Sequence, residues 1–227
     1  MLYNHTSRVN HLHMSQAALL LSYWCPAGSP DEEKPKSTSW LRAAIGHARA
    51  IRADAYGDGE SDKREINSDD QYYDSSYLKN LWWCCIIRDR IMSLCFRQPI
   101  QIRRTDFDFA TKKPPGLSDL NSGLDDSEAY SLQSKDLIAG ITALLAELCV
   151  HLTDTLDLVY GESGGDAFSD AHGCFTKRLH FAKDHLRIWH KTASSNLSGW
   201  EDGLPEIAED ERHMITLWTN LLWIYYE

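Results

Sequence analysis

The chain has 227 residues, of which 43% are hydrophobic and 25% charged, and its 33 acidic and 23 basic side chains give a formal net charge of −10. A chain of this length hides roughly 70% of the surface that it exposes when unfolded, so its apolar content can build a core and a wholly disordered chain is excluded. The acidic balance argues against a surface that binds nucleic acid throughout, because phosphate binding requires clustered Lys and Arg side chains.

Six segments place apolar side chains at helical spacing and none shows the alternation of a strand, which predicts an all-α fold, an irregular bundle of about six helices with long loops. The first predicted helix covers residues 12–24. The second covers residues 39–56, with Ser39 as its candidate N-cap. Residues 54–74 then hold eight acidic and two basic side chains, which predicts a solvated acidic loop.

The third predicted helix runs from about Asp74 to Phe96, and Asp89 interrupts its apolar stripe. Burying an unpaired carboxylate is costly, so we expect Asp89 to have an Arg or backbone partner. The following segment, residues 97–116, is basic and contains several prolines. It is predicted to be an irregular connector packed on the helices.

Three further helices are predicted after a loop over residues 114–133. They cover residues 134–161, with Ser134 as the N-cap, about 171–193 and about 206–226. The last of them carries an apolar face formed by Met214, Leu217, Trp218, Leu221, Leu222 and Tyr225.

A helix face this apolar needs a partner surface, so we expect a homodimer contact or another protein partner through the C-terminal helix. The apolar pattern is still running where the sequence stops at Glu227. We therefore interpret residues 1–227 as one all-α regulatory domain whose C-terminal end is truncated.

Residues 77–109, YLKNLWWCCIIRDRIMSLCFRQPIQIRRTDFDF, carry a resemblance to a known family. They resemble the fungal-specific transcription factor domain, or middle homology region, of fungal binuclear zinc cluster regulators, and look most like its cutinase transcription factor beta group. Two departures stand out: Lys79-Asn80 replaces the usual Arg pair, and Gln98-Pro99 replaces Arg-Pro, with the basic residue at Arg97. The six-cysteine DNA-binding cluster of the family is absent, so we expect no direct nucleic acid binding by this chain.

The resemblance implies a regulatory, effector-response region whose apolar interior holds a small apolar metabolite, with no catalytic residue and no cofactor. The candidate ligand-binding residues are Trp82, Trp83, Arg88, Asp89 and Arg97. Adjacent tryptophans on a helix point about 100° apart, so one can face the core while the other lines a groove, or both can be packing residues. The Arg-Asp-Arg run either forms a buried ion pair that docks the helix onto the basic connector, or binds a ligand.

Asp69, Asp70 and Asp74 form a DDxxxD spacing. In a helix, Asp70 and Asp74 lie one turn apart and could hold a Mg²⁺ ion that binds a diphosphate. Terpene cyclases use such clusters in all-helical folds, so a Mg²⁺-dependent biosynthetic enzyme of fungal secondary metabolism is the alternative function. The other interpretation of these aspartates is an acidic loop that enters a helix, with Asp near the positive end of the helix. For the chain as a whole, a third possible function is that of an inert remnant or a dominant-negative partner.

Apolar runs, the N-terminal residues and the cysteines indicate where in the cell the protein is expected. No run approaches the ~18 to 20 apolar residues of a membrane span, and the first residues lack the order of a signal peptide, so we expect no membrane contact. None of the six cysteines makes the C-x₂-C spacing of structural zinc sites, which predicts reduced core cysteines in a reducing compartment. The resemblance implies the nucleus, and without it we would expect the cytoplasm.

Overall fold

The computed structural model describes residues 10–24, 36–57, 74–121, 130–161, 172–201 and 207–227. All regular elements in these ranges are helices, which confirms the predicted all-α fold. The chain divides into two compact units, residues 1–88 and 89–227, and each is described by itself. The single domain expected over residues 1–227 stays a prediction.

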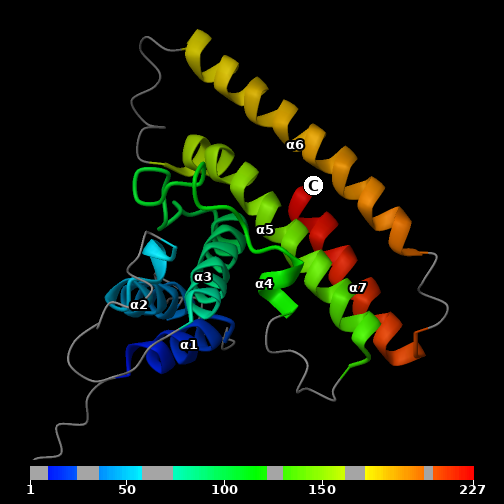
Figure 1. Cartoon of the computed structure of the whole chain (residues 1–227). Coiled ribbons are helices and arrows are strands. Elements are labelled where there is room, and N and C mark those ends of the chain that lie inside the picture. Colours follow the sequence, from blue (N-terminus) through cyan, green and yellow to red (C-terminus); the bar gives the residue numbers. More distant parts are fainter. Residues whose placement is uncertain (1–9, 25–35, 58–73, 122–129, 162–171, 202–206) are drawn as a thin grey trace, which may run out of the picture. The chain divides into compact units, whose positions relative to one another are not determined.

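The first unit consists of α1 (His11–Ser22), α2 (Lys36–Ala50), the short 3₁₀ helix η1 (Ala53–Ala55) and the first part of α3 (Ser75–Phe96). Helices α1 and α2 lie side by side (Figure 1). Ser15 of α1 donates its hydroxyl to the Ala44 carbonyl of α2 at 2.8 Å, so this buried hydroxyl is satisfied. Most of the apolar stripe that the sequence pattern predicts for α2 is buried, at Leu41, Ala44, Ile45 and Ala48, but Trp40 of that stripe is 42% exposed.

Helix α2 begins at Lys36, so the prediction of Ser39 as its N-cap is wrong. The buried face starts earlier than the apolar pattern indicates, because the small polar side chain of Ser37 is already in the core. Of the acidic loop predicted over residues 54–74, only residues 54–57 and 74 are described, and η1 occupies part of that range.

The second unit contains the end of α3, the short α4 (Leu117–Asn121), and the long helices α5 (Leu132–Tyr160), α6 (His172–Glu201) and α7 (Glu209–Tyr226). Helices α4, α6 and α7 each pack on α5, which is the central helix of this unit (Figure 1). Helix α5 starts before the predicted N-cap: Ser131 is the cap, and its hydroxyl accepts a hydrogen bond from the backbone N–H of Ser134 at 3.3 Å.

Helix α5 also corrects the expectation that no segment is apolar enough to cross a membrane. Its best 18-residue window has a mean hydropathy of 1.6, and 61% of that window is buried within the structure. Two of the polar residues in its apolar run bond within the helix: Thr142 and Thr153 donate their hydroxyls to the carbonyls of Ile138 and Cys149 at 2.8 Å. The helix therefore uses its apolar surface as the core element of the second unit.

Helix α7 buries only part of the face that the sequence predicts. Leu222 of that face is buried, but Met214, Leu217 and Trp218 are 36%, 54% and 39% exposed, and Ile215, which lies outside the predicted face, is buried in their place. The pattern misleads because α7 is apolar on two faces, and only its packing on α5 decides which one is covered. A homodimer or protein contact through the other face stays a prediction.

The cysteines are only partly the core residues that the sequence predicts. Cys85 and Cys149 are buried, but Cys84 and Cys95 on α3 are exposed. An all-apolar pattern around a helix cannot tell which of two adjacent thiols faces the core.

Glu211 joins the start of α7 to the start of α5. Its carboxylate accepts hydrogen bonds from the Ser134 hydroxyl at 2.5 Å, from the Ser131 hydroxyl at 2.7 Å and from the Ser131 backbone N–H at 3.0 Å. These bonds hold the pKa of the Glu211 carboxyl below its usual range, because they favour its charged form. The stability that they contribute is therefore present above the ordinary Glu pKa of about 4.3 and is lost as pH falls through the lower folded-state pKa.

We expect Glu211→Gln to lower the melting temperature at pH 7 and to have progressively less effect as the pH is lowered towards 3. The measurement is a series of thermal melts between pH 3 and pH 7 for the wild type and the variant. Glu209→Gln, an exposed position in the same helical turn, serves as the control and should behave as the wild type throughout. A loss of the same size at every pH would contradict a role for the Glu211 charge.

Candidate functional site

Asp89 is buried in the second unit, with 2% of its surface exposed, and holds the backbone of the connector. Its carboxylate accepts the N–H groups of Gln101 at 3.0 Å and Ile102 at 3.1 Å, together with the Arg90 guanidinium at 2.5 Å. The prediction of an Arg or backbone partner for Asp89 is thus confirmed, with both kinds present.

Arg90 is completely buried and completes this arrangement from the next position on α3. Its Nη2 donates to the Ile102 carbonyl at 2.8 Å, and its Nε donates to the hydroxyl of Thr153 on α5 at 3.1 Å. The Asp89 side chain thus binds the backbone N–H groups of residues 101–102, and the Arg90 side chain binds the carbonyl of Ile102. We call Asp89 and Arg90, with residues 101–102 and Thr153, the connector clamp.

In the clamp, burial of the two charged groups and their pairing shift the pKa values in opposite directions. Burial raises the pKa of the Asp89 carboxyl, and the Arg90 charge and the backbone N–H groups act against that rise. Burial likewise lowers the pKa of Arg90, and the Asp89 charge opposes it. Nearby, burial raises the pKa of the Cys149 thiol to about 12, so this cysteine is neutral and unsuited to nucleophilic chemistry.

The connector is irregular and packs on α5, as predicted. Arg104 forms a two-pronged ion pair with Asp154, whose second contact, from Nη2 to Oδ2, measures 2.9 Å. The rings of Phe107 and Phe109 are buried and meet edge to face, with centroids 4.9 Å apart. The hydrogen bonds of the clamp run to the chain's own backbone and to the side chain of Thr153, which favours a structural ion pair over a ligand-binding role.

Arg97 ends α3 in the left-handed conformation, with φ of 51°, and its side chain is exposed. The N–H of Gln98 reaches back to the Ser93 carbonyl at 3.3 Å, and the Ser93 hydroxyl donates to the Gln98 carbonyl at 2.6 Å. This is the hydrogen-bond pattern of a helix end in which glycine is the usual residue. A ligand contact at Arg97 stays a prediction.

The two predicted tryptophans lie in the first unit, and both are buried. The indole N–H of Trp83 donates to the hydroxyl of Tyr56 at 2.8 Å, and the Arg49 guanidinium lies 5.7 Å from the Trp82 ring centre. This geometry favours the interpretation that both are packing residues, because neither ring is left at the surface.

Arg88 belongs to the same unit and closes the end of α1. Its Nε donates to the Ser22 hydroxyl at 3.0 Å, its Nη2 donates to the Ser22 carbonyl, and the guanidinium lies 4.0 Å from the ring centre of Tyr23. A cation at the carbonyl end of a helix is stabilising, so a structural role accounts for Arg88. Its predicted role in ligand binding stays untested.

The aspartate cluster is described only at its last member. Asp69 and Asp70 lie outside the described residues, whereas Asp74 is exposed and accepts the backbone N–H of Ser76 at 3.2 Å. Asp74 thus caps α3 at its positive end, as in the interpretation of an acidic loop entering a helix. Within the described ranges no group of three or more His, Cys, Asp or Glu side chains is placed to hold a metal ion.

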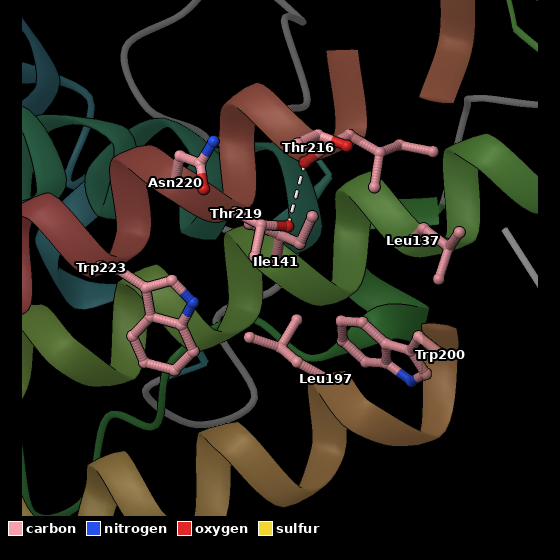
Figure 2. A pocket seen from close by; sticks show the side chains of 9 residues that line it. Leu137, Ile141, Leu197, Trp200, Thr216, Thr219, Asn220 and Trp223 are labelled. Atoms are coloured by element: carbon pink, nitrogen blue, oxygen red, sulfur yellow. Dashed lines mark hydrogen bonds between the residues drawn. The ribbon is translucent and has the colours of Figure 1, made fainter. Parts of the chain in front are cut away.

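A pocket that the sequence analysis missed lies between α5, α6 and α7 (Figure 2). Its volume is about 270 Å³. It is lined by Leu137, Ile141, Leu197, Trp200, Ile215, Thr216, Thr219, Asn220 and Trp223. Its floor is the buried cluster that includes Ile141 and Ile215, so the pocket sits directly on the core of the second unit.

Aromatic contacts bound the pocket at both ends. At one end, Trp200 of α6 packs so closely on Gly140 of α5 that a Cβ at that glycine would lie 2.4 Å from the indole Cη2. At the other end, His190 of α6 stacks on Tyr226 of α7 with ring centres 4.5 Å apart, beside Trp223. A glycine in the middle of a long apolar helix was the one sequence signal that pointed to such a close approach.

Comparisons with known proteins identify what the chain is similar to. The family model described as fungal specific transcription factor domain matches residues 1–202. A protein named transcription factor, from Fusarium pseudograminearum (strain CS3096), is 26% identical over 164 residues, which are 67% of this chain and 16% of that protein. Cutinase transcription factor 1 beta of Fusarium vanettenii is 31% identical over 109 residues, 48% of this chain and 11% of that protein. No solved structure matches the chain.

We expect Asp89→Asn to lower the free energy of unfolding by about 3 to 5 kcal/mol, because it leaves the Arg90 charge buried without a counterion. Urea unfolding followed by circular dichroism measures the change. Asp106→Asn is the control, because Asp106 is an exposed residue of the same connector that accepts the N–H of Arg103 at 3.1 Å, a bond that Asn can also accept. An unfolding midpoint for Asp89→Asn equal to that of the control would show that the ion pair is dispensable.

We expect Arg97→Gly to raise the free energy of unfolding by about 0.5 to 1 kcal/mol, since glycine adopts a positive φ without the strain of a Cβ atom. Arg97→Ala removes the same charge but keeps the Cβ, so it should give no gain. Equal stabilities for the two variants in urea unfolding would exclude backbone strain as the cause.

Proposed function

This chain belongs to the family of fungal specific transcription factor domains, and from that membership we propose that it acts as the regulatory region of a transcription factor whose DNA-binding segment is a separate part of the protein. The observation that carries the proposal is the family match over residues 1–202. The connector clamp is consistent with it, because Asp89 and Arg90 of the Arg-Asp-Arg run that carries the family resemblance are here buried and bonded to the chain itself.

The matched stretches cover 16% and 11% of the two curated relatives, so the activity of a whole protein is part of the proposal. Both relatives are named as transcription factors, which supports a nuclear location. The net charge of −10 supports DNA binding by another segment, because an acidic surface repels phosphates.

The proposed mode of action is a response to a small apolar metabolite. The pocket between α5, α6 and α7 supports it, since apolar clefts with a few polar groups are the usual sites for such ligands. The exposed apolar face of α7, with Leu217, Trp218 and Ile224, supports a second copy or another protein as a further partner.

The alternative, a Mg²⁺-dependent enzyme with Asp69, Asp70 and Asp74 as ligands, has less support. Asp74 is engaged as a helix cap, and the family match favours the regulator. We propose no catalytic residue and no resident cofactor.

The proposal is tested in two steps on the whole chain. Alone, the chain should give no sequence-specific, salt-resistant shift of promoter fragments in a gel assay, because its net charge is −10 and its cysteines lack the spacing of a zinc cluster. Fused to an unrelated DNA-binding domain and activation domain, it should change the output of a reporter gene. Asp89→Ala should abolish that change by unfolding the clamp, whereas the control Asp106→Asn should retain it.

Two results would contradict the proposal. One is an unchanged reporter with a folded, expressed fusion. The other is Mg²⁺-dependent turnover of a prenyl diphosphate that is lost when Asp69, Asp70 and Asp74 are all replaced by Asn, which would establish the enzyme.

A further inference from the structure

The chemistry of the pocket between α5, α6 and α7 defines a class of ligand. None of the nine described residues that line it carries a charge. A charged group inside it would lose hydration without gaining a counterion, so the lining disfavours ions of either sign. A ligand of this pocket is therefore neutral.

The hydroxyl and side-chain amide groups of the pocket all belong to α7, and the lining also contains the indole N–H groups of Trp200 and Trp223. The two threonine hydroxyls are placed to act as hydrogen-bond acceptors. Thr216 donates its hydroxyl to the Arg212 carbonyl at 2.9 Å, and Thr219 donates to the Ile215 carbonyl at 3.0 Å. With their protons used inside the helix, both hydroxyl oxygens keep lone pairs that can accept a bond from a ligand. Asn220, exposed at the same edge, offers a further amide oxygen.

The apolar part of the lining fits a flat ring system. In Figure 2 the indole rings of Trp200 and Trp223 lie at opposite ends of the lining, with Leu197 between them. Aromatic rings offer broad, rigid faces for stacking. The volume of about 270 Å³ equals that of about nine liquid water molecules at about 30 Å³ each, which suits a small fused-ring molecule.

We propose that the pocket between α5, α6 and α7 binds a neutral, flat, fused-ring molecule that carries one hydrogen-bond donor, with the rings among Ile141, Leu197 and the two indoles and the donor at Thr216 and Thr219. The inference rests on the proposed function in one respect: such a molecule is the effector of the regulatory region. Binding at this site is a separate claim and is measured without any reporter.

The test uses three probes with one ring system and the complete purified chain. 2-Naphthol is neutral and carries a donor, 2-methoxynaphthalene lacks the donor, and 2-naphthoate is charged. Titrations are followed through the indole N–H signals in two-dimensional NMR spectra, since the chain has eight tryptophans and two of them line the pocket. We expect 2-naphthol to bind about fivefold more tightly than 2-methoxynaphthalene, the ratio for one net hydrogen bond, and 2-naphthoate to bind more weakly than both.

Matched variants locate the binding. The double variant Thr216→Val and Thr219→Val should remove the preference for 2-naphthol over 2-methoxynaphthalene. The control double variant Thr142→Val and Thr192→Val should keep it, because these threonines make the same bond to the carbonyl four residues earlier but lie outside the lining.

A second pair of variants tests the indole end of the pocket. Gly140→Ala should displace Trp200 and weaken binding of both neutral probes, with helix content retained by circular dichroism. Gly46→Ala, at a helical glycine with no heavy atom within 4 Å of an added Cβ, should leave binding unchanged.

Three results would overturn the proposal: no binding of 2-naphthol, equal binding of all three probes, or a preference that the pocket threonine variant retains. Failure here leaves the reporter result standing, so the regulatory role would survive without this ligand site. Conversely, threonine-dependent binding with an unchanged reporter would keep the site and remove its role as the effector site.

Discussion

The buried ion pair between Asp89 and Arg90 is the interaction on which the second unit depends. Each ion would lose several kcal/mol of hydration if it were buried alone, and the pair is tolerated because every group has a specified partner. Those partners are the backbone of residues 101–102 and the hydroxyl of Thr153. The desolvated charges therefore impose one position on the connector and one register on α5, since any other arrangement leaves a buried charge unsatisfied.

Helix α5 contacts the connector clamp near one end and α6 and α7 near the other. Its C-terminal half meets the clamp at Thr153 and the Arg104 ion pair at Asp154. Its N-terminal half receives Trp200 at Gly140 and is joined to α7 through Glu211. Thr153 and Gly140 are separated by about 20 Å at the helical rise of about 1.5 Å per residue, so one rigid helix joins the clamp to the pocket.

The pocket exists because α6 and α7 both pack on α5 and meet each other through rings. The stacking of His190 on Tyr226 spaces the two helices at one end, and the indole of Trp200 fills the notch at Gly140 at the other. Bulky aromatic contacts hold neighbouring helices apart where smaller side chains line the gap. The same packing leaves the second apolar face of α7 uncovered, with Leu217 and Trp218 in solvent.

The sequence by itself determined the six long helices, the irregular connector and the need of Asp89 for a partner, because helical periodicity and the cost of a buried charge are local properties that a pattern of residues carries. It missed the short α4, which lies in the loop predicted over residues 114–133, and the last residues of α6, which runs to Glu201 and not to about residue 193. The family resemblance likewise rests on a local run, around the Arg-Asp-Arg residues. Only the tertiary structure decided that Ser131 and not Ser134 caps α5, that α7 buries Ile215 and not Leu217, and that Trp200 meets Gly140. Each of these depends on residues up to 80 positions apart in the chain, as with Ser131 and Glu211, and spacing along one segment contains no information about such a partner.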